Sequence, residues 1–330
     1  MSHAIGAPDT GRKRGSGEEG AERMSVSVII PVYGGERTIA ELVRRAHALL
    51  EGCAARHEII LVNDCSPDGS WRVLENLASV DGRVQAIDLM RNYGQHNALL
   101  CGIRAAQYDT IVTMDDDLQH PPEEIPKLLD KLAEGFDVVY GVPENEEHDL
   151  WRSLASQVTK LALKSAIGVR IARDVSAFRA FRTQVREAFA THQAPFVSID
   201  VLLTNGTTRF GAVAVRHEPR RVGVSGYSFR KLLTHALNMM TGFSTLPLQF
   251  ASVVGFSFTI FGICVLGYVL GRYLMQGAAV PGFAFLASLV AIFSGAQLFA
   301  IGIIGEYLAR MHFRMMDKPT YVVRSTTRRE

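Results

Sequence analysis

Apolar and polar positions alternate along the first part of the chain in a pattern that predicts an α/β fold. Short runs of consecutive apolar residues are separated by segments that carry apolar residues at helical spacing. The predicted strands are 26–32, 58–64, 84–89 and 110–115, and the predicted helices between them are 39–50, 70–77 and 97–106. Strands that are apolar along their whole length and alternate with helices are typical of a parallel sheet covered on both faces.

The pattern changes in the last third of the chain. Residues 232–271, and again residues 273–305, contain no Asp, Glu, Lys or Arg. Within them, Phe250–Leu270 and Phe283–Gly305 are 21 and 23 residues long. Each is long enough to cross a hydrocarbon layer about 30 Å thick, which predicts a two-helix transmembrane hairpin rather than a pair of buried core helices.

The segments around these two spans predict how the chain meets the membrane. Residues 228–247 place apolar positions at helical spacing beside Arg230 and Lys231, which is typical of an interfacial amphipathic helix. Positive residues precede the first span and follow the second, whereas the connector carries only Arg272. The positive-inside rule therefore predicts that the soluble domain and both termini are cytoplasmic.

These patterns give a division of the chain into five parts. Residues 1–24 are rich in Gly, Glu, Arg and Ser without an apolar run, so they predict a disordered tail and not a cleaved signal. The predicted parts are the tail 1–24, a soluble domain 25–227, the interfacial helix 228–247, the two membrane helices within 248–309, and a cytoplasmic C-terminal tail 310–330.

Charge and cysteine content exclude several classes of function. The net charge of +2 and the absence of a basic stripe do not favour nucleic-acid binding. The cysteines (Cys53, Cys65, Cys101 and Cys264) lack the paired spacing of a zinc or redox site. Neither a dinucleotide-binding glycine fingerprint nor a phosphate-binding loop is present, so dehydrogenase and NTPase functions have little support.

Polar residues end the predicted strands. In parallel sheets ligands bind beyond the carboxyl ends of the strands, so Tyr33, Asp64, Arg91 and Asp115 are expected to converge on one edge. Asp68 is adjacent to the helix that begins at Ser70 and suits the role of its N-cap. Asp64 is therefore left to accept hydrogen bonds from a base or ribose. Arg91 ends the next strand, and its guanidinium is suited to bind a diphosphate.

The acidic triplet Asp115-Asp116-Asp117 follows the apolar run TIVTM. One interpretation is that the three acids cap the helix that begins near Pro121. The other is a metal site for Mg²⁺ or Mn²⁺, because carboxylate oxygens suit these ions and residues i and i+2 of a strand point the same way. The position after a buried strand favours the metal site, with Asp115 and Asp117 as ligands and Asp116 as an incidental residue.

Motifs spread over residues 25–325 resemble glycosyltransferase family 2. They are PVYGGE (31–36), VNDCS (62–66), RNYGQH (91–96), DDDLQHPPEE (115–124), Asp174, Phe178-Arg179, His217 and Arg220-x-x-Gly223-x-Ser225-x-Tyr227, in that order. With the two hydrophobic segments, the set is similar to the polyprenyl-phosphate glycosyltransferase branch. That branch includes dolichyl-phosphate mannose synthases, bactoprenol glucosyltransferases and undecaprenyl-phosphate 4-deoxy-4-formamido-L-arabinose transferases.

The resemblance implies a GT-A (Rossmann-like) fold and a set of site residues. The nucleotide-sugar side would use Pro31, Tyr33, Glu36, Asp64, Arg91, Asp115 and Gln119, with the metal on Asp115 and Asp117. The acceptor phosphate would meet Arg179, His217, Arg220, Ser225 and Tyr227, and the groups nearest the reaction would be Asp117, Asp174, Arg179 and Arg220. The sequence departs from the family at Gly34, Asp116 and Gly226, where Asn, Ala and Lys are frequent.

The implied reaction moves a sugar, with inversion, from a nucleotide-sugar donor (UDP-sugar favoured) to a polyprenyl phosphate such as undecaprenyl phosphate. A phosphate monoester has a second pKa of about 6, so it is largely dianionic at neutral pH and needs little help from a base. Asp174 would then order arginines or contact the sugar. His217 either binds phosphate or packs at a strand end.

Two other functions are compatible with the chain. A transferase that extends a polysaccharide or glycolipid usually carries a Gln-x-x-Arg-Trp motif, and neither Trp71 nor Trp151 has that context. A non-catalytic nucleotide-binding scaffold on the membrane would have no need for both metal-site acids and an arginine cluster. Homo-oligomers through the membrane helices are compatible with the sequence, which fixes no subunit number.

Overall fold

The computed structural model describes residues 23–144, 175–193, 197–218, 246–276, 282–316 and 318–327. Several predicted features lie outside these ranges. They are the N-terminal tail up to residue 22, the interfacial helix up to residue 245, and the site residues Asp174, Arg220, Ser225 and Tyr227.

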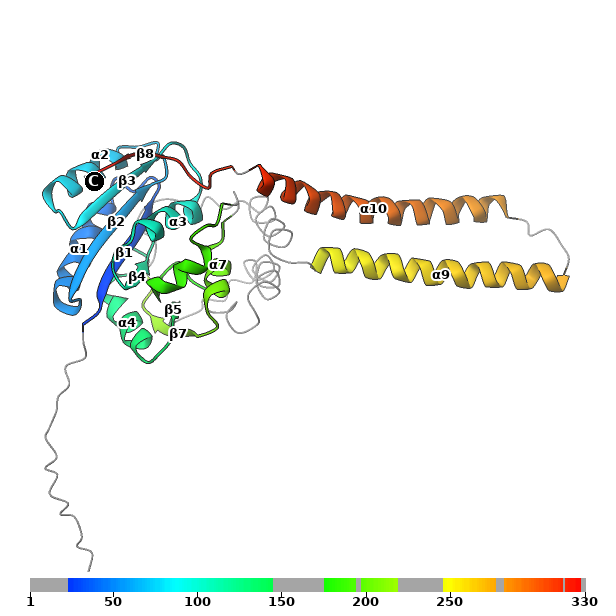
Figure 1. Ribbon diagram of the computed structural model, residues 1–330, viewed down its shortest axis with the longest axis horizontal. Helices are drawn as coiled ribbons and strands as arrows, with labels where there is room; N and C mark the ends of the chain where they lie inside the picture. The colour runs from blue at the N-terminus through cyan, green and yellow to red at the C-terminus, as the bar shows by residue number, and fades with distance from the viewer. Residues whose placement is uncertain are drawn as a thin grey trace, which may run out of the picture.

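One mixed sheet of eight strands forms the centre of the soluble domain (Figure 1). Its order is β7-β5-β6-β4-β1-β2-β3-β8. The strands are β1 Ser25–Val32, β2 Arg56–Asn63, β3 Val84–Leu89, β4 Thr110–Thr113, β5 Val138–Pro143, β6 Arg179–Arg182, β7 Phe210–Val215 and β8 Val323–Thr326. The pairs β1–β2, β2–β3, β1–β4 and β5–β7 are parallel, whereas β6 and β8 run antiparallel to their neighbours. The predicted mainly parallel α/β sheet is confirmed.

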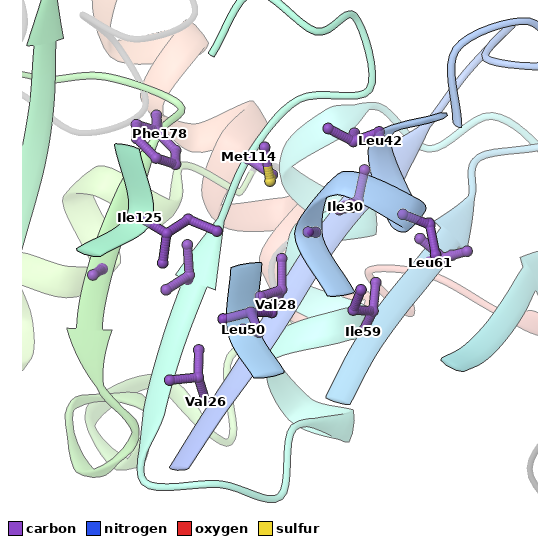
Figure 2. Packing of buried hydrophobic residues seen from close by; sticks show 14 of the residues in the cluster. Val26, Val28, Ile30, Leu42, Leu50, Ile59, Leu61, Met114, Ile125 and Phe178 are labelled. Atoms are coloured by element: carbon purple, nitrogen blue, oxygen red, sulfur yellow. The ribbon is translucent and has the colours of Figure 1, made fainter. Parts of the chain in front are cut away.

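Helices cover both faces of this sheet. They are α1 Ile39–Cys53, α2 Ser70–Val80, α3 Gln95–Ala105, α4 Ile125–Ala133 and α7 Ile199–Gly206, with short 3₁₀ turns at Pro122–Glu124 and Thr183–Phe189. Alternate residues of β1 face opposite layers: Val28 packs with α1, and Ile29 with α3. Figure 2 shows the first layer, in which Val28 and Ile30 lie beside Leu42 and Leu50 of α1. The apolar runs are continuous because both faces of the central strands are buried.

Two long helices, α9 Leu246–Gln276 and α10 Phe283–Met315, extend away from the domain side by side (Figure 1). Their segments Leu248–Met275 and Ile292–Ala309 are long and apolar enough to span a membrane, with mean hydropathies of 2.2 and 1.5. Phe293 of α10 lies 5.7 Å, centroid to centroid, from the ring of Phe258 on α9. Both helices extend beyond the predicted spans because charged residues mark the edge of a membrane but do not end a helix.

The chain does not continue as a free tail after α10. Val323–Thr326 returns to the sheet as β8 and pairs antiparallel with β3, with Val323 opposite Leu89 and Thr326 opposite Ile87. Tyr321, just before β8, packs into the hydrophobic cluster that contains α3. Because β8 runs antiparallel to β3, the chain enters the sheet at the carboxyl ends of the parallel strands. The C-terminal end of α10, which joins the domain, and that edge of the sheet are therefore on the same side of the domain (Figure 1).

Candidate active site

A pocket of about 260 Å³ lies at the carboxyl ends of β1, β2 and β4. Its lining residues are Pro31, Val32, Tyr33, Asp64, Asn92, Gly94, Gln95, Asp115, Asp116 and Asp117. The predicted convergence of strand ends is thus confirmed for Tyr33, Asp64 and Asp115. From the loop after β3, Asn92 lines the pocket in place of Arg91, whose guanidinium lies 4.6 Å from the centre of the Tyr93 ring.

All three acids of the triplet line this pocket, which differs from the predicted alternation. β4 ends at Thr113, so the triplet lies beyond the strand in a turn where Leu118 has a φ of 60°. Asp115 accepts a hydrogen bond of 2.6 Å from Gln95 Nε2, and Asp117 accepts one of 3.1 Å from the backbone N–H of Gln119. The rule that residues i and i+2 share a face therefore does not apply to the triplet.

Asp116 connects the triplet to the loop after β1. Its Oδ2 accepts a hydrogen bond of 3.1 Å from the backbone N–H of Tyr33. A Cβ at the neighbouring Gly35 would lie 2.7 Å from the same oxygen, so any larger residue there would require the Asp116 carboxylate to move. Burial, reinforced by repulsion from Asp115 and Asp117, raises the pKa of Asp116 to about 7 against the opposing effect of the Tyr33 amide.

The donor set of the pocket fits a hard divalent cation. Carboxylate oxygens are the preferred ligands of Mg²⁺ and Mn²⁺, and such ions often use one or two carboxylates together with substrate phosphates. Among the residues that the structure describes, no cluster of three or more His, Cys, Asp and Glu side chains forms a complete metal cage. Asp115 and Asp117 would therefore hold an ion only with oxygens from a bound diphosphate or water.

Asp64 is held by its own backbone surroundings. The carboxylate is only 3% exposed, and its two oxygens accept hydrogen bonds of 2.7 and 2.8 Å from the backbone N–H groups of Tyr93 and Gly94. Burial raises its pKa, and these two hydrogen bonds oppose the shift. These hydrogen bonds fix the loop that carries Asn92. Asp64 also lines the pocket, and its predicted contact with a base or ribose stays a prediction.

A second set of hydrogen bonds joins the loops after β1 and β2. The N-cap of α2 is Gly69, so the prediction that Asp68 is the N-cap is wrong by one residue. Asp68 still accepts from the backbone N–H of Ser70 at 3.1 Å, and from that of Glu36 at 3.3 Å. Glu36 in turn accepts from the backbone N–H of Gly69 at 3.1 Å. Glu36 therefore holds the two loops together and is not among the residues that line the pocket.

Arg179 lies in the interior of the protein. Its side chain is 2% exposed, and Nη1 donates to Oδ1 of Asp200, which also accepts from the hydroxyl of Tyr140 at 3.1 Å. A contact between this guanidinium and an acceptor phosphate has no support in this arrangement. Sequence reasoning missed Asp200, although an acid within the apolar segment IDVLL is a signal for a buried partner.

His217 lies beside the loop that follows the triplet. Its ring is 5.0 Å from that of His120, centroid to centroid, and His120 stacks on Phe178 at 5.3 Å. The next residue, Glu218, donates its backbone N–H to the carbonyl of Gln119 at 2.8 Å. Burial, with a smaller effect of His217, lowers the pKa of His120 to about 4. The structure thus brings one predicted acceptor residue next to the predicted metal loop.

Residues 27–190 match the family Glycosyl transferase family 2. Three curated relatives carry the name undecaprenyl-phosphate 4-deoxy-4-formamido-L-arabinose transferase. They come from Pseudomonas fluorescens (strain SBW25; 34% identical, covering 92% of this chain and 90% of the relative), Pseudomonas paraeruginosa (strain DSM 24068 / PA7; 36%, 92% and 90%) and Pectobacterium carotovorum subsp. carotovorum (strain PC1; 34%, 92% and 93%).

Among solved structures, glucosyl-3-phosphoglycerate synthase from Mycobacterium tuberculosis, in complex with Mn²⁺, uridine diphosphate and phosphoglyceric acid, has a similar fold. The TM-score is 0.50 at 17% sequence identity, and the match covers 66% of this chain and 76% of that one. It confirms the predicted GT-A architecture of the soluble domain.

Proposed function

The chain belongs to glycosyltransferase family 2, in its polyprenyl-phosphate branch, and on this basis we propose that it transfers a sugar from a nucleoside diphosphate sugar to a polyprenyl phosphate. A UDP-sugar is the favoured donor and undecaprenyl phosphate the favoured acceptor. The names of the relatives make 4-deoxy-4-formamido-L-arabinose the first donor sugar to test.

One observation supports the proposal most directly. The acidic pocket lies at the carboxyl edge of the sheet. This edge is on the side where the C-terminal end of α10 joins the domain through β8. A water-soluble donor can enter the pocket from the cytoplasm, while an acceptor whose tail stays in the bilayer can present its phosphate to the same pocket from the membrane. The catalytic domain and both chain ends would be cytoplasmic, and the two helices would cross the inner membrane.

On the donor side, Asp115 and Asp117 would hold Mg²⁺ or Mn²⁺ together with the diphosphate, and the ion would neutralise the leaving diphosphate as a Lewis acid. Pro31 and Tyr33 line the same pocket and would contact the base and ribose. Asp64 would act through the loop that it fixes. Gln119, Arg91 and Glu36 would support the site from its borders.

On the acceptor side, a phosphate oxygen would attack the anomeric carbon as the bond to the diphosphate breaks, with inversion. The dianionic lipid phosphate is itself a sufficient nucleophile at neutral pH. Cationic groups are needed to position it, and Arg220 and Arg221 are the proposed pair, with His217, Ser225 and Tyr227 as hydrogen-bonding partners. Asp174 would orient these groups, and Arg179 would act from the interior through its pairing with Asp200.

The proposal is tested with purified protein in detergent, undecaprenyl phosphate, a panel of UDP- and GDP-sugars, and Mn²⁺ or Mg²⁺. Sugar label is expected in the lipid fraction for at least one donor, and removal of the metal with a chelator is expected to abolish it. Asp117→Asn should lower the rate about a hundredfold. Asp109→Asn is the matched control, because Asp109 is exposed at the opposite end of β4. Absence of labelled lipid for every combination would refute the proposal.

A further inference from the structure

Arg324 of β8 is bonded to the end of β3. Its Nη1 donates to Oδ2 of Asp88 at 3.1 Å, and its Nη2 donates to the carbonyl of Met90 at 2.8 Å. Asp88 is 2% exposed, so its carboxylate depends on protein partners in place of water. Charge-assisted hydrogen bonds to a buried carboxylate are among the stronger polar interactions in proteins.

The other oxygen of Asp88 continues the connection toward the pocket. Oδ1 accepts a hydrogen bond of 2.7 Å from Nδ2 of Asn63, which is itself buried at the end of β2. The amide oxygen of Asn63 accepts from the hydroxyl of Ser66 at 2.6 Å and from its backbone N–H at 3.2 Å. Ser66 Oγ then accepts from the backbone N–H of Gly34 at 3.2 Å.

Gly34 and Asn63, two members of this chain of hydrogen bonds, are each next in sequence to a residue that lines the pocket. Gly34 follows Tyr33, and Asn63 precedes Asp64, and both Tyr33 and Asp64 line it. The amide of Asn63 has one orientation that satisfies both neighbours: Nδ2 toward Asp88 and Oδ1 toward Ser66. Loss of Arg324 would leave the Asp88 carboxylate with one cationic partner fewer and weaken the constraint on Asn63.

The segment that carries Arg324 is itself attached firmly. Thr320 is buried, Tyr321 packs beside α3, and Met90 donates its backbone N–H to the carbonyl of Val322 at 2.9 Å. The backbone N–H of Thr327 donates to the carbonyl of Ala86 at 3.0 Å. This segment follows α10, which ends at Met315. It therefore lies in the chain between the long apolar helix and the hydrogen bonds that lead to the pocket.

We propose that Arg324 is a positioning residue for the donor pocket, and that attachment of β8 and binding of the donor nucleotide stabilise each other. The proposal rests on the proposed function in taking the occupant of the pocket to be a nucleoside diphosphate. Because such coupling is reciprocal, a nucleotide in the pocket should also protect β8 from opening. The donor site would thereby sense whether the chain beyond the membrane helices is in place.

The test compares the full-length protein in detergent with the variants Arg324→Gln and Arg324→Lys. Hydrogen exchange is followed by mass spectrometry, and UDP and GDP binding with Mn²⁺ by calorimetry. Arg72→Gln is the matched control, because Arg72 is exposed on α2. In Arg324→Gln, amides of residues 33–36 and 63–68 should exchange faster, while those of β5 and β7 stay unchanged. The nucleotide dissociation constant should rise about five- to tenfold, and Arg324→Lys should fall between the two.

Each result has a defined meaning. If the amides of residues 33–36 and 63–68 exchange at the same rate in Arg324→Gln as in wild type, the proposal is overturned. Faster exchange throughout the sheet would also overturn it, since that indicates general destabilisation. If wild type binds neither UDP nor GDP, the proposed donor class is wrong, and the exchange data alone decide whether Arg324 positions the pocket. In a double-mutant cycle with Asp88→Asn, the double variant should lose no more nucleotide-binding free energy than the more harmful single variant.

Discussion

The backbone N–H of Tyr33 donates a hydrogen bond of 3.1 Å to Oδ2 of Asp116, 83 residues away in the sequence. The bond joins the loop after β1 to the turn after β4, two walls of the same pocket. The sequence left Asp116 without a role because the acids on either side of it were the predicted metal ligands. In the structure Asp116 is the acid that holds the loop carrying Tyr33 in place.

Replacement of Asp116 by Ala should weaken donor binding more than it affects the chemical step. Loss of the hydrogen bond that fixes the Tyr33 loop is expected to raise the donor KM about five- to tenfold, while kcat stays within about twofold. Steady-state kinetics with varied donor provide the measurement. Asp130→Ala, at an exposed position on α4, serves as control. A donor KM equal to that of wild type would contradict this role.

Gly35→Ala should be more harmful than Asp116→Ala, and the two together should be less harmful than Gly35→Ala alone. The added Cβ would lie 2.7 Å from Asp116 Oδ2 and 3.0 Å from Val32 Cγ1, so removal of the carboxylate relieves the closer contact. Donor KM and the midpoint of thermal unfolding are both measured. Gly52→Ala is the control, since a Cβ there would meet nothing within 4 Å. A double variant worse than either single one would exclude this steric explanation.

Arg179→Met should destabilise the domain by about 3 kcal/mol or more, because it leaves the carboxylate of Asp200 buried without its cation. The matched control is Arg182→Met on the same strand: its side chain is 41% exposed and 3.6 Å from Asp137, so about 1 kcal/mol or less is expected. Arg179→Met/Asp200→Leu should recover much of the loss. Thermal unfolding in detergent is the measurement, and equal shifts for the two arginine variants would disprove the assignment.

Stability should fall as the pH drops below about 6.5 because of His47 and His57. Burial lowers the pKa of both imidazoles, with Arg83 acting in the same direction and Asp81 and Glu51 opposing. The unfolded chain therefore binds more protons than the folded one below the ordinary histidine pKa. Asp81 itself stays ionised in this range, because its hydrogen bond from Arg83 holds its pKa at about 2.

The measurement for this prediction is the midpoint of thermal unfolding at pH 5 and pH 7.5, for wild type and for His47→Gln/His57→Gln. The two rings are joined at 2.9 Å between Nδ1 of His47 and Nε2 of His57. The double variant should lose part of the difference between the two pH values. An unchanged difference would show that other groups govern the acid sensitivity.

The sequence predicted the sheet and its functional edge because both depend on local pattern. Apolar runs mark the buried strands, and polar residues directly after them mark the edge where Tyr33, Asp64 and Asp115 meet. The prediction from the sequence was wrong about where β4 ends, and the end of the strand decides which way the acids of the triplet point. β4 stops at Thr113, two residues before its predicted end, and that places all three acids of the triplet in the pocket.

Pairings between distant segments were also missed. Arg324 and Asp88 are 236 residues apart, and Arg179 and Asp200 are 21 apart on different elements. Nothing in the local pattern of either member specifies its partner, since the pairing follows from strand register and helix packing. β8 has four residues, too few for a periodic signal, and it follows a long apolar segment that favours the interpretation of a tail.

The position of β8 also has a consequence for how the protein is made. Both long apolar helices precede this strand in the chain, so the ribosome synthesises it after them. Domains fold largely in the order of synthesis, and the outer edge of β3 therefore stays unpaired until then. An unpaired strand edge is prone to join other chains. Prompt docking of β8 on β3 would shorten the time during which a newly made molecule is exposed to aggregation.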